Sequence, residues 1–238
     1  MRFATPLIEG RLIRRYKRFL ADIALPDGTE VTAHCANPGG MIGLNMPGIG
    51  AYLSYHDKPS RKLKHSLELV RLDDGTFVGI NTSHPNGLVE EAIRDGTIAE
   101  LSGYESLRRE VRYGKNSRID ILLESPDRPP CYVEVKNVHL TRPDGPHPTA
   151  AEFPDAVTAR GAKHLREMTD MVDDGARAVM VYLVQRSDND HFRIAADIDP
   201  AYDDALRQAR AKGVEAICYA CQVSPAGITV EKPLPLVL

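Results

Sequence analysis

The chain has 238 residues, of which 42% are hydrophobic and 26% charged, so it is long enough to bury the core of one large domain or two smaller ones. Its formal net charge of −3 argues against a uniformly basic nucleic-acid-binding protein. No apolar stretch approaches the roughly 20 residues of a membrane span, and the first residues lack the apolar core of a signal peptide. We therefore expect a cytoplasmic protein with no membrane association, in which the four cysteines form no disulfide framework.

Positive charge is concentrated near the N-terminus. Residues 1–70 carry ten Lys and Arg against six Asp and Glu, and the rest of the chain carries twenty against twenty-seven. Five basic residues lie between positions 11 and 18 with no acid among them: Arg11, Arg14, Arg15, Lys17 and Arg18. Binding a phosphate backbone requires local positive charge, so this segment is a candidate nucleic-acid contact. A solvated basic face explains the same charges equally well.

The first eighty residues are predicted to form short strands separated by turns. Residues 7–25 are rich in strand-forming side chains, and further strands are expected at 30–35, 51–55, 67–71 and 76–80. Pro26-Asp27-Gly28 and Asp73-Asp74-Gly75 are turn signals between them. About five strands with Gly-rich turns favour a small closed barrel of the OB-fold type over residues 1–82.

Residues 83–238 alternate between helices and strands. A helix is expected after residue 84, then strands near 106–113, 118–123 and 132–140, and a mobile Pro-rich loop at 141–152. Pro154-Asp155 is predicted to open a helix to about Val172, with Val157, Gly161, Leu165, Met168 and Val172 as its buried stripe. A strand at 178–184, a helix at 202–212 and a strand at 214–223 complete an α/β domain. Cys218 and Cys221 lie three apart in that last strand, so we expect two core cysteines on opposite faces.

Two of these strands carry charged residues within otherwise apolar segments. Successive side chains of a strand point to opposite faces, so Glu134 and Lys136 share one face while Val133 and Val135 take the other. Asp120 stands alone in the apolar run 117–123. If the two strands are neighbours, Asp120, Glu134 and Lys136 converge. Two carboxylates and an ammonium suit magnesium-dependent phosphodiester hydrolysis, although Glu and Lys two apart on an exposed strand are common.

Longer motifs resemble the sugar fermentation stimulation protein A (SfsA) family. They are residues 15–22 (RYKRFLAD), 34–41 (HCANPGGM), 101–104 (LSGY), 117–120 (SRID), 132–138 (YVEVKNV) and 153–165 (FPDAVTARGAKHL). The resemblance implies an N-terminal OB-fold followed by a PD-(D/E)xK nuclease-like α/β domain. It also implies binding to DNA with weak sequence preference.

The resemblance also implies roles for individual residues. Asp120 matches the lone acid of the nuclease pattern, and Glu134-Val135-Lys136 matches its E-x-K segment. Asp120, Glu134 and the Val135 carbonyl are then expected to hold Mg²⁺ or Mn²⁺, while Lys136 orients the attacking water. The first helix of related folds often adds an acid, for which Glu91 is slightly favoured over Glu90.

The predicted DNA contacts fall into two groups. Arg14, Arg15, Lys17 and Arg18 come from the basic N-terminal segment. Arg160 and Lys163, with His164 beside them, form a helix face that is expected next to the acid pair. Tyr16, Phe19, Tyr52 and Tyr55 are candidate stacking platforms, although some must fill the barrel core.

Three functions remain open at this stage. The first is a DNA-binding protein with a metal-dependent nuclease site. The second is a regulator of sugar-use (maltose-type) genes that binds DNA without cutting it and retains a vestigial nuclease fold. The third is a protein that binds no nucleic acid, for which no Walker, dinucleotide-binding or nucleophile-elbow motif is found. The oligomeric state is not determined by the sequence.

Overall fold

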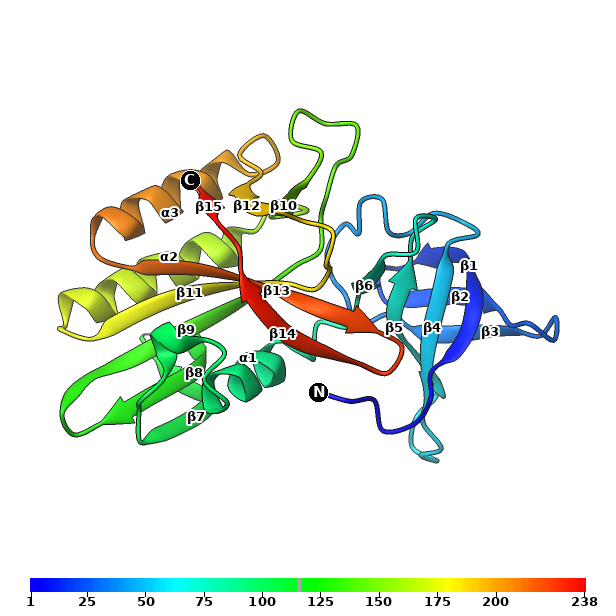
Figure 1. Ribbon diagram of the computed structural model, residues 1–238, viewed down its shortest axis with the longest axis horizontal. Coiled ribbons are helices and arrows are strands. Elements are labelled where there is room, and N and C mark those ends of the chain that lie inside the picture. The colour runs from blue at the N-terminus through cyan, green and yellow to red at the C-terminus, as the bar shows by residue number, and fades with distance from the viewer. Residues whose placement is uncertain (115–116) are drawn as a thin grey trace.

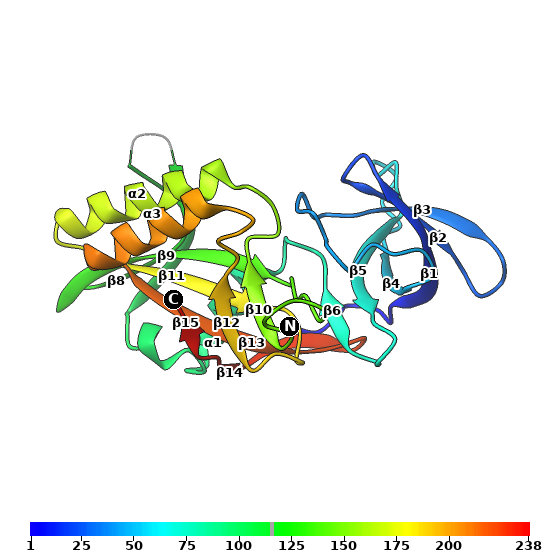
Figure 2. The ribbon, with the colours of Figure 1, turned by 90° about the horizontal axis from the view of Figure 1, so that it is seen from above.

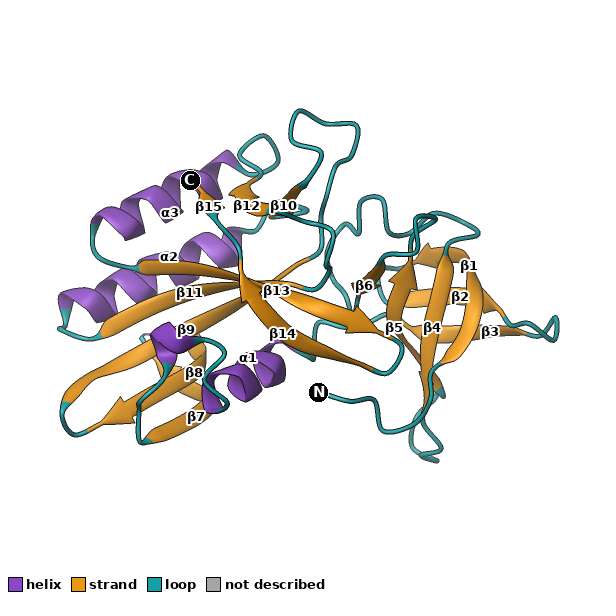
Figure 3. Ribbon diagram, in the orientation of Figure 1, coloured by secondary structure: helices purple, strands orange, loops and turns teal. Residues whose placement is uncertain are grey.

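The computed structural model describes residues 1–114 and 117–238. Two lobes lie side by side, an all-strand lobe from the N-terminal part of the chain and an α/β lobe from the remainder (Figure 1). The helices are confined to the second lobe (Figure 3). Among the described residues, no helix is long and apolar enough to cross a membrane.

The first lobe is a small barrel. Its strands are β1 (Ile8–Tyr16), β2 (Leu20–Ala24), β3 (Glu30–His34), β4 (Gly50–Tyr55), β5 (His65–Arg71) and β6 (Phe77–Gly79). They pair in the order β3-β2-β1-β4-β5-β6, and an additional parallel pairing of β3 with β5 closes the first five into a barrel. Leu12, Ile23 and Leu53 fill its interior. The predicted turns are present, with Gly28 at φ 85° and Gly75 at φ 92°, backbone angles that favour glycine.

The second lobe is built on a six-stranded mixed sheet in the order β14-β13-β11-β9-β8-β7. These strands are β7 (Ser106–Tyr113), β8 (Ser117–Ser125), β9 (Arg128–Val138), β11 (Arg177–Val184), β13 (Glu215–Ser224) and β14 (Gly227–Pro233). The helices are α1 (Pro85–Arg94), the 3-10 turn η1 (Ala99–Leu101), α2 (Ala159–Asp173) and α3 (Pro200–Ala211). A small parallel sheet pairs β10 (Ala150–Phe153) with β12 (His191–Ile194) and β12 with β15 (Leu236–Val237).

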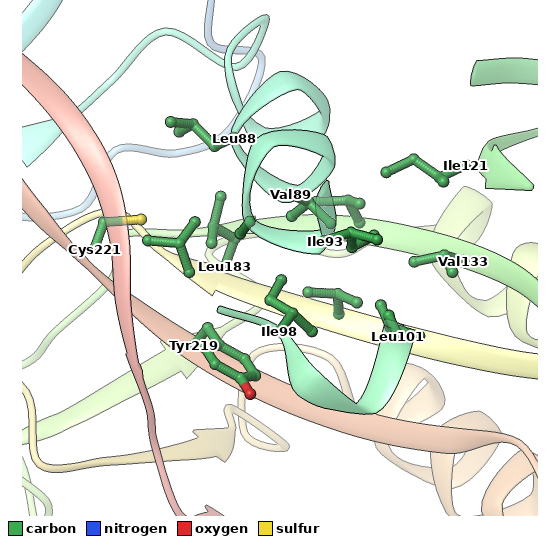
Figure 4. Packing of buried hydrophobic residues seen from close by; sticks show 14 of the residues in the cluster. Leu88, Val89, Ile93, Ile98, Leu101, Ile121, Val133, Leu183, Tyr219 and Cys221 are labelled. Atoms are coloured by element: carbon green, nitrogen blue, oxygen red, sulfur yellow. The ribbon is translucent and has the colours of Figure 1, made fainter. Parts of the chain in front are cut away.

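Strand alternation divides the core of this lobe into two layers. Val179, Val181 and Leu183 of β11 face the layer that contains α1, shown in Figure 4. Met180 and Tyr182 of the same strand face α2 and α3, which cover the opposite side of the sheet (Figure 2). On β9, Val133 and Val135 belong to the α1 layer, so Glu134 and Lys136 point toward the α2 side. Burial on both faces explains the nearly continuous apolar run of β11.

The two cysteines of β13 confirm this alternation. Cys221 packs in the α1 layer and Cys218 in the α2 and α3 layer, both buried and both as thiols. The pair therefore does not converge on one point, as predicted from the three-residue spacing in a strand.

Contacts from several parts of the chain join the two lobes. The β13–β14 hairpin reaches toward the barrel (Figure 1), and the Gly79 N–H of β6 donates to the Gln185 carbonyl at 2.8 Å. Met1 and Phe3 pack against the α1 layer of the α/β lobe. The buried Glu68 carboxylate of the barrel accepts hydrogen bonds from Ser54, from Asn81 and from His84 at the start of α1.

The segment before α2 differs from the sequence prediction. The helix begins at Ala159 rather than at Pro154, because the Thr158 side chain caps it by accepting the Gly161 N–H at 3.1 Å. Asp155 turns toward the barrel instead, where its carboxylate accepts the Met41 N–H at 3.0 Å. Val157 is 75% exposed, so its assignment to the buried stripe is wrong.

The rest of the stripe is buried or half-buried, which fits a helix that packs one face on the sheet. The segment expected to be a loop up to residue 152 also ends in strand β10. The predicted architecture is nevertheless confirmed, with an OB-type barrel followed by an α/β domain.

Candidate metal and nucleic-acid site

The acid pair lies where strands β8 and β9 begin to diverge. The ladder pairs Ile121 with Val133, and Asp120 and Glu134 are the next residues along each strand. At this point the Asp120 carboxylate, and not a backbone carbonyl, is the hydrogen-bond acceptor between the strands: its Oδ2 accepts the Val135 N–H at 2.8 Å. Asp120 is thus tied to the backbone of the E-x-K segment itself.

Glu134 is almost completely buried, with 2% of its surface exposed. Its Oε1 accepts the Lys136 Nζ at 2.6 Å and also contacts Nδ1 of His164 on α2. Its Oε2 is buried and has no hydrogen-bond partner among the residues described. Burial alone would raise the pKa of Glu134, but Lys136 and His164 outweigh it and hold the pKa below its usual range.

Asp120 has the opposite electrostatic character. Burial, followed by the negative charge of Glu134, raises its pKa from 3.8 to about 6, and the Val135 N–H, Asn86 and Lys136 oppose this only in part. Asn86, in the first turn of α1, donates to Asp120 Oδ1 at 2.9 Å. The two carboxylates therefore repel each other, and a cation between them would remove that repulsion.

These groups border one cavity of about 250 Å³. It is lined by Thr82, Pro85, Asn86, Asp120, Glu134, Val135, Lys136, Asn137, Arg160 and His164. The structure thus brings the predicted acid pair, Val135, Lys136 and Arg160 together around one space.

The donor set fits a hard divalent cation. Glu134 Oε2 is a buried oxygen without a partner in the described chain, and Asp120 is held beside it through Val135. No group of three or more His, Cys, Asp or Glu in the described residues has the arrangement of a metal cage. Two carboxylates with open positions suit Mg²⁺, which usually keeps several waters and binds substrate phosphates.

Two of the predicted site residues have other partners. The Glu91 carboxylate lies 2.5 Å from the Met1 amino group and does not border the cavity, so the structure does not place it as the accessory acid. The Lys163 Nζ lies 3.2 Å from Ser117 Oγ and 3.4 Å from the Glu167 carboxylate. Lys163 lies one turn after Arg160 on α2, and it does not line the cavity.

Sequence reasoning missed Asn86 entirely. It lies between Pro85 and Gly87 in what looked like a loop leading into a helix, and an Asn in such a position is usually explained as a turn residue. His164 was expected beside the site, but its direct contact with Glu134 was not foreseen. Its signal was its position one turn after Arg160 on the same helix.

The basic N-terminal residues differ in their contacts: Arg14 is exposed but paired, Arg15 is half-buried, and Lys17 and Arg18 are exposed. Arg14 pairs with Asp22 at 2.8 Å, and Arg15 donates to the carbonyls of Asn37 and Gly39 at 2.8 and 2.9 Å. Lys17 and Arg18 occupy the exposed turn between β1 and β2, with φ of 49° and 62°. Of the aromatic candidates, Tyr52 is buried, whereas Phe19 and Tyr55 are 46% and 48% exposed.

A cleft of about 490 Å³ lies between this turn and the segment before α2. It is bordered on the barrel by Arg18 and the 37–40 turn and on the α/β lobe by His139 and residues 153–158. Thr82 and Asn137 line both this cleft and the smaller cavity, so the two spaces are contiguous. The cleft beside the basic turn and the cavity at the carboxylates therefore adjoin at Thr82 and Asn137.

The chain thus combines a closed barrel with an α/β domain whose acid pair lines a cavity. A family model described as the sugar fermentation stimulation protein RE domain matches residues 83–227, and one described as the SfsA N-terminal OB domain matches residues 13–80. The chain belongs to the sugar fermentation stimulation protein family.

Known proteins resemble the chain over its whole length. The sugar fermentation stimulation protein homolog of Paramagnetospirillum magneticum is 60% identical over 236 residues, covering 99% of this chain and 98% of its own. The homolog from Rhodospirillum centenum is 59% identical and covers 99% of each. The solved structure of Pyrococcus furiosus SfsA in complex with Ca²⁺ has a TM-score of 0.88 at 26% identity, covering 100% of this chain and 98% of that one.

Proposed function

We propose that this protein binds DNA and hydrolyses its phosphodiester bonds with Mg²⁺ or Mn²⁺ at the Asp120–Glu134 cavity. The observation that carries the proposal is Glu134 Oε2, which has no hydrogen-bond partner among the described residues and is buried beside a second carboxylate and an ammonium group. An unsatisfied buried carboxylate oxygen is costly, and a bound cation would satisfy it. The relative from Pyrococcus furiosus was solved with Ca²⁺, which prefers oxygen ligands as Mg²⁺ does.

The chain's own groups have distinct tasks in this proposal. Asp120, Glu134 and the Val135 carbonyl hold the cation, which when bound supplies Lewis-acid activation of a phosphate oxygen and of water. Lys136 donates one hydrogen bond to Glu134 Oε1 at 2.6 Å. Its two other N–H groups remain to donate to the attacking water or to the phosphate. Arg160, at the cavity wall, provides a positive charge for a phosphate oxygen.

DNA is the proposed substrate because the basic turn and the site lie on one contiguous surface. Arg18 lines the barrel side of the cleft, Lys17 precedes it in the same exposed turn, and Arg160 lines the adjoining smaller cavity. Contacts of this kind go to phosphates, which carry no sequence information, so we expect weak sequence preference. The four buried cysteine thiols fit the reducing cytoplasm, where we place the activity.

A cleavage assay tests this function. Purified protein should cut at least one of a set of labelled duplex, single-stranded and branched DNAs when Mg²⁺ or Mn²⁺ is added, and EDTA should stop the reaction. Asp120→Ala, Glu134→Ala and Lys136→Ala should each abolish cutting, while Asp127→Ala, which removes an exposed acid at the β8–β9 turn, should not. Cutting that survives all three site changes would contradict the proposal. Metal-independent DNA binding without any cleavage would instead favour the regulator.

A further inference from the structure

A buried histidine joins the acid pair to helix α2. His164 is 5% exposed and bonds at both of its ring nitrogens. Nδ1 contacts Glu134 Oε1, and Nε2 lies 3.2 Å from the Nε of Arg160, one helical turn earlier. The three side chains form a continuous chain from the cavity wall to the buried carboxylate.

The chemistry of the two partners fixes the histidine tautomer. An arginine can only donate hydrogen bonds, so Nε2 of His164 must be the acceptor and carry no hydrogen. The proton of the neutral ring therefore lies on Nδ1, which donates to Glu134 Oε1. This is the way a metal-site carboxylate or histidine is commonly held by an outer partner.

This hydrogen bond decides which oxygen of Glu134 is available. Oε1 already accepts the Lys136 Nζ at 2.6 Å, so the His164 proton gives it a second donor. Rotation of the carboxylate would break both bonds inside a site with 2% exposure, where little water can replace them. Oε2 is consequently left as the oxygen that a cation can use.

The same ring also holds the arginine. Arg160 donates its Nε to His164, and no other hydrogen bond of its guanidinium is found among the described residues. Its two terminal NH₂ groups therefore remain for a ligand at the cavity that the residue lines. A planar guanidinium with one edge anchored is well suited to a phosphate.

We propose that His164 is a positioning residue for two ligands at once: it holds Glu134 with Oε2 presented to the cation, and it holds Arg160 for a phosphate oxygen. The inference rests on the proposed function, because it assigns His164 to the same metal and phosphate site. A purely structural histidine would not separate the two kinds of binding. The proposed role predicts that cation binding depends on Nδ1 and phosphate binding on Nε2.

Mn²⁺ binding to the full chain tests the inference without requiring activity. The paramagnetic resonance signal of free Mn²⁺ is measured during titration of wild type, His164→Ala, His164→Asn and His164→Gln. Asn places an amide near the Nδ1 position and can donate to Glu134, whereas Gln places it near Nε2 and serves only Arg160. His191→Ala, which removes a histidine paired with Asp190 at the surface, is the matched control.

We expect His164→Ala to weaken Mn²⁺ binding about 10- to 100-fold, as is typical when an outer partner of a metal ligand is removed. His164→Asn should restore most of the Mn²⁺ affinity but keep a weakened binding affinity for DNA, because Arg160 stays unanchored. His164→Gln should show the reverse. If the alanine variant fails to fold, as judged by its thermal transition, the Asn and Gln pair carries the test.

Two outcomes separate the inference from the function beneath it. Wild-type Mn²⁺ affinity in His164→Ala, or the same affinity in the Asn and Gln variants, would overturn the role of His164 and leave the metal site standing. No Mn²⁺ binding by the wild-type chain would overturn the proposed function, and this inference with it.

Discussion

Replacing Asp120 by Asn should stabilise the metal-free protein while it destroys the cation site. The pKa of Asp120 is raised from 3.8 to about 6 by burial and by the charge of Glu134. Because the folded-state pKa lies above the unfolded value, folding favours the protonated carboxyl. Ionisation of Asp120 does not destabilise the metal-free protein below pH 3.8. The loss of stability grows as the pH rises and is complete above about pH 6.

The size of this penalty follows from the pKa difference. One pKa unit corresponds to about 1.4 kcal/mol, so ionised Asp120 costs the folded protein about 3 kcal/mol at pH 8. Asn removes the charge, but its side-chain NH₂ group cannot accept a hydrogen bond. One of the two donors that Asp120 satisfies, the Val135 N–H or Asn86, then loses its acceptor, which costs the folded protein about 1 kcal/mol. The net gain of about 2 kcal/mol corresponds to a rise in Tm of about 4 to 8 °C for a chain of this length.

The assay is thermal unfolding at pH 8 in EDTA and again with Mg²⁺ or Mn²⁺. Asp120→Asn should melt higher than wild type in EDTA and should gain nothing from the cation, whereas wild type should gain. At pH 4 in EDTA Asp120→Asn should melt no higher than wild type, because wild-type Asp120 is then largely protonated and the cost of the amide remains. Asp127→Asn, at an exposed position, should match wild type throughout. A lower Tm for Asp120→Asn in EDTA at pH 8 would refute the electrostatic reasoning.

Further predictions concern the basic turn, the lobe contact and the thiols. Lys17→Ala with Arg18→Ala should lower the slope of log K against log salt for DNA by about 2, since each phosphate contact contributes about 0.9; an unchanged slope would remove this turn from the interface. Burial alone would raise the pKa of Glu68, but its hydrogen-bonding partners lower it overall, so its contribution to stability is present at neutral pH and lost as the pH falls through the folded pKa. Glu68→Gln should therefore reduce the loss of urea stability between pH 7 and pH 4, and an equal loss in both proteins would contradict this. Burial raises the pKa of the Cys218 and Cys221 thiols, so a thiol reagent at pH 8 should label them only as fast as the protein unfolds, and immediate labelling would count against their core position.

Period-two alternation explains why much of the site geometry could be predicted. Glu134 and Lys136 had to share a face once the segment was a strand, and Val133 and Val135 had to share the other. The pairing of β8 with β9 then placed Asp120 next to Glu134. These are local rules that hold regardless of the rest of the fold.

The parts that failed depend on contacts distant in sequence. Pro154-Asp155 is a good helix start by local preference, but the Asp155 carboxylate bonds to the Met41 N–H, 114 residues away, and the helix begins later. The prediction of Glu91 as an accessory acid from its place in the first helix stays untested, but the contact of its carboxylate with Met1 was likewise not foreseeable from local sequence. Such pairings are set by tertiary packing, which overrides a propensity worth a fraction of a kcal/mol per residue.

The residues that sequence reasoning undervalued are polar groups with ordinary local explanations. Asn86 was indistinguishable from a turn residue, and only the docking of α1 against β8 brings it to Asp120. Val157 fitted the helical stripe by spacing, but it lies before the helix starts and is exposed. Spacing identifies which residues share a face only where the element itself is present.

The most direct test of the metal site is anomalous diffraction from a crystal of the protein soaked in Mn²⁺. One strong peak is expected in contact with Glu134 Oε2 and the Asp120 carboxylate, with His164 still bonded to Glu134 Oε1. In a crystal of Glu134→Gln treated in the same way, the peak should be lost or greatly weakened. A wild-type crystal with no Mn²⁺ at this pair, under conditions in which the protein cuts DNA, would contradict the account.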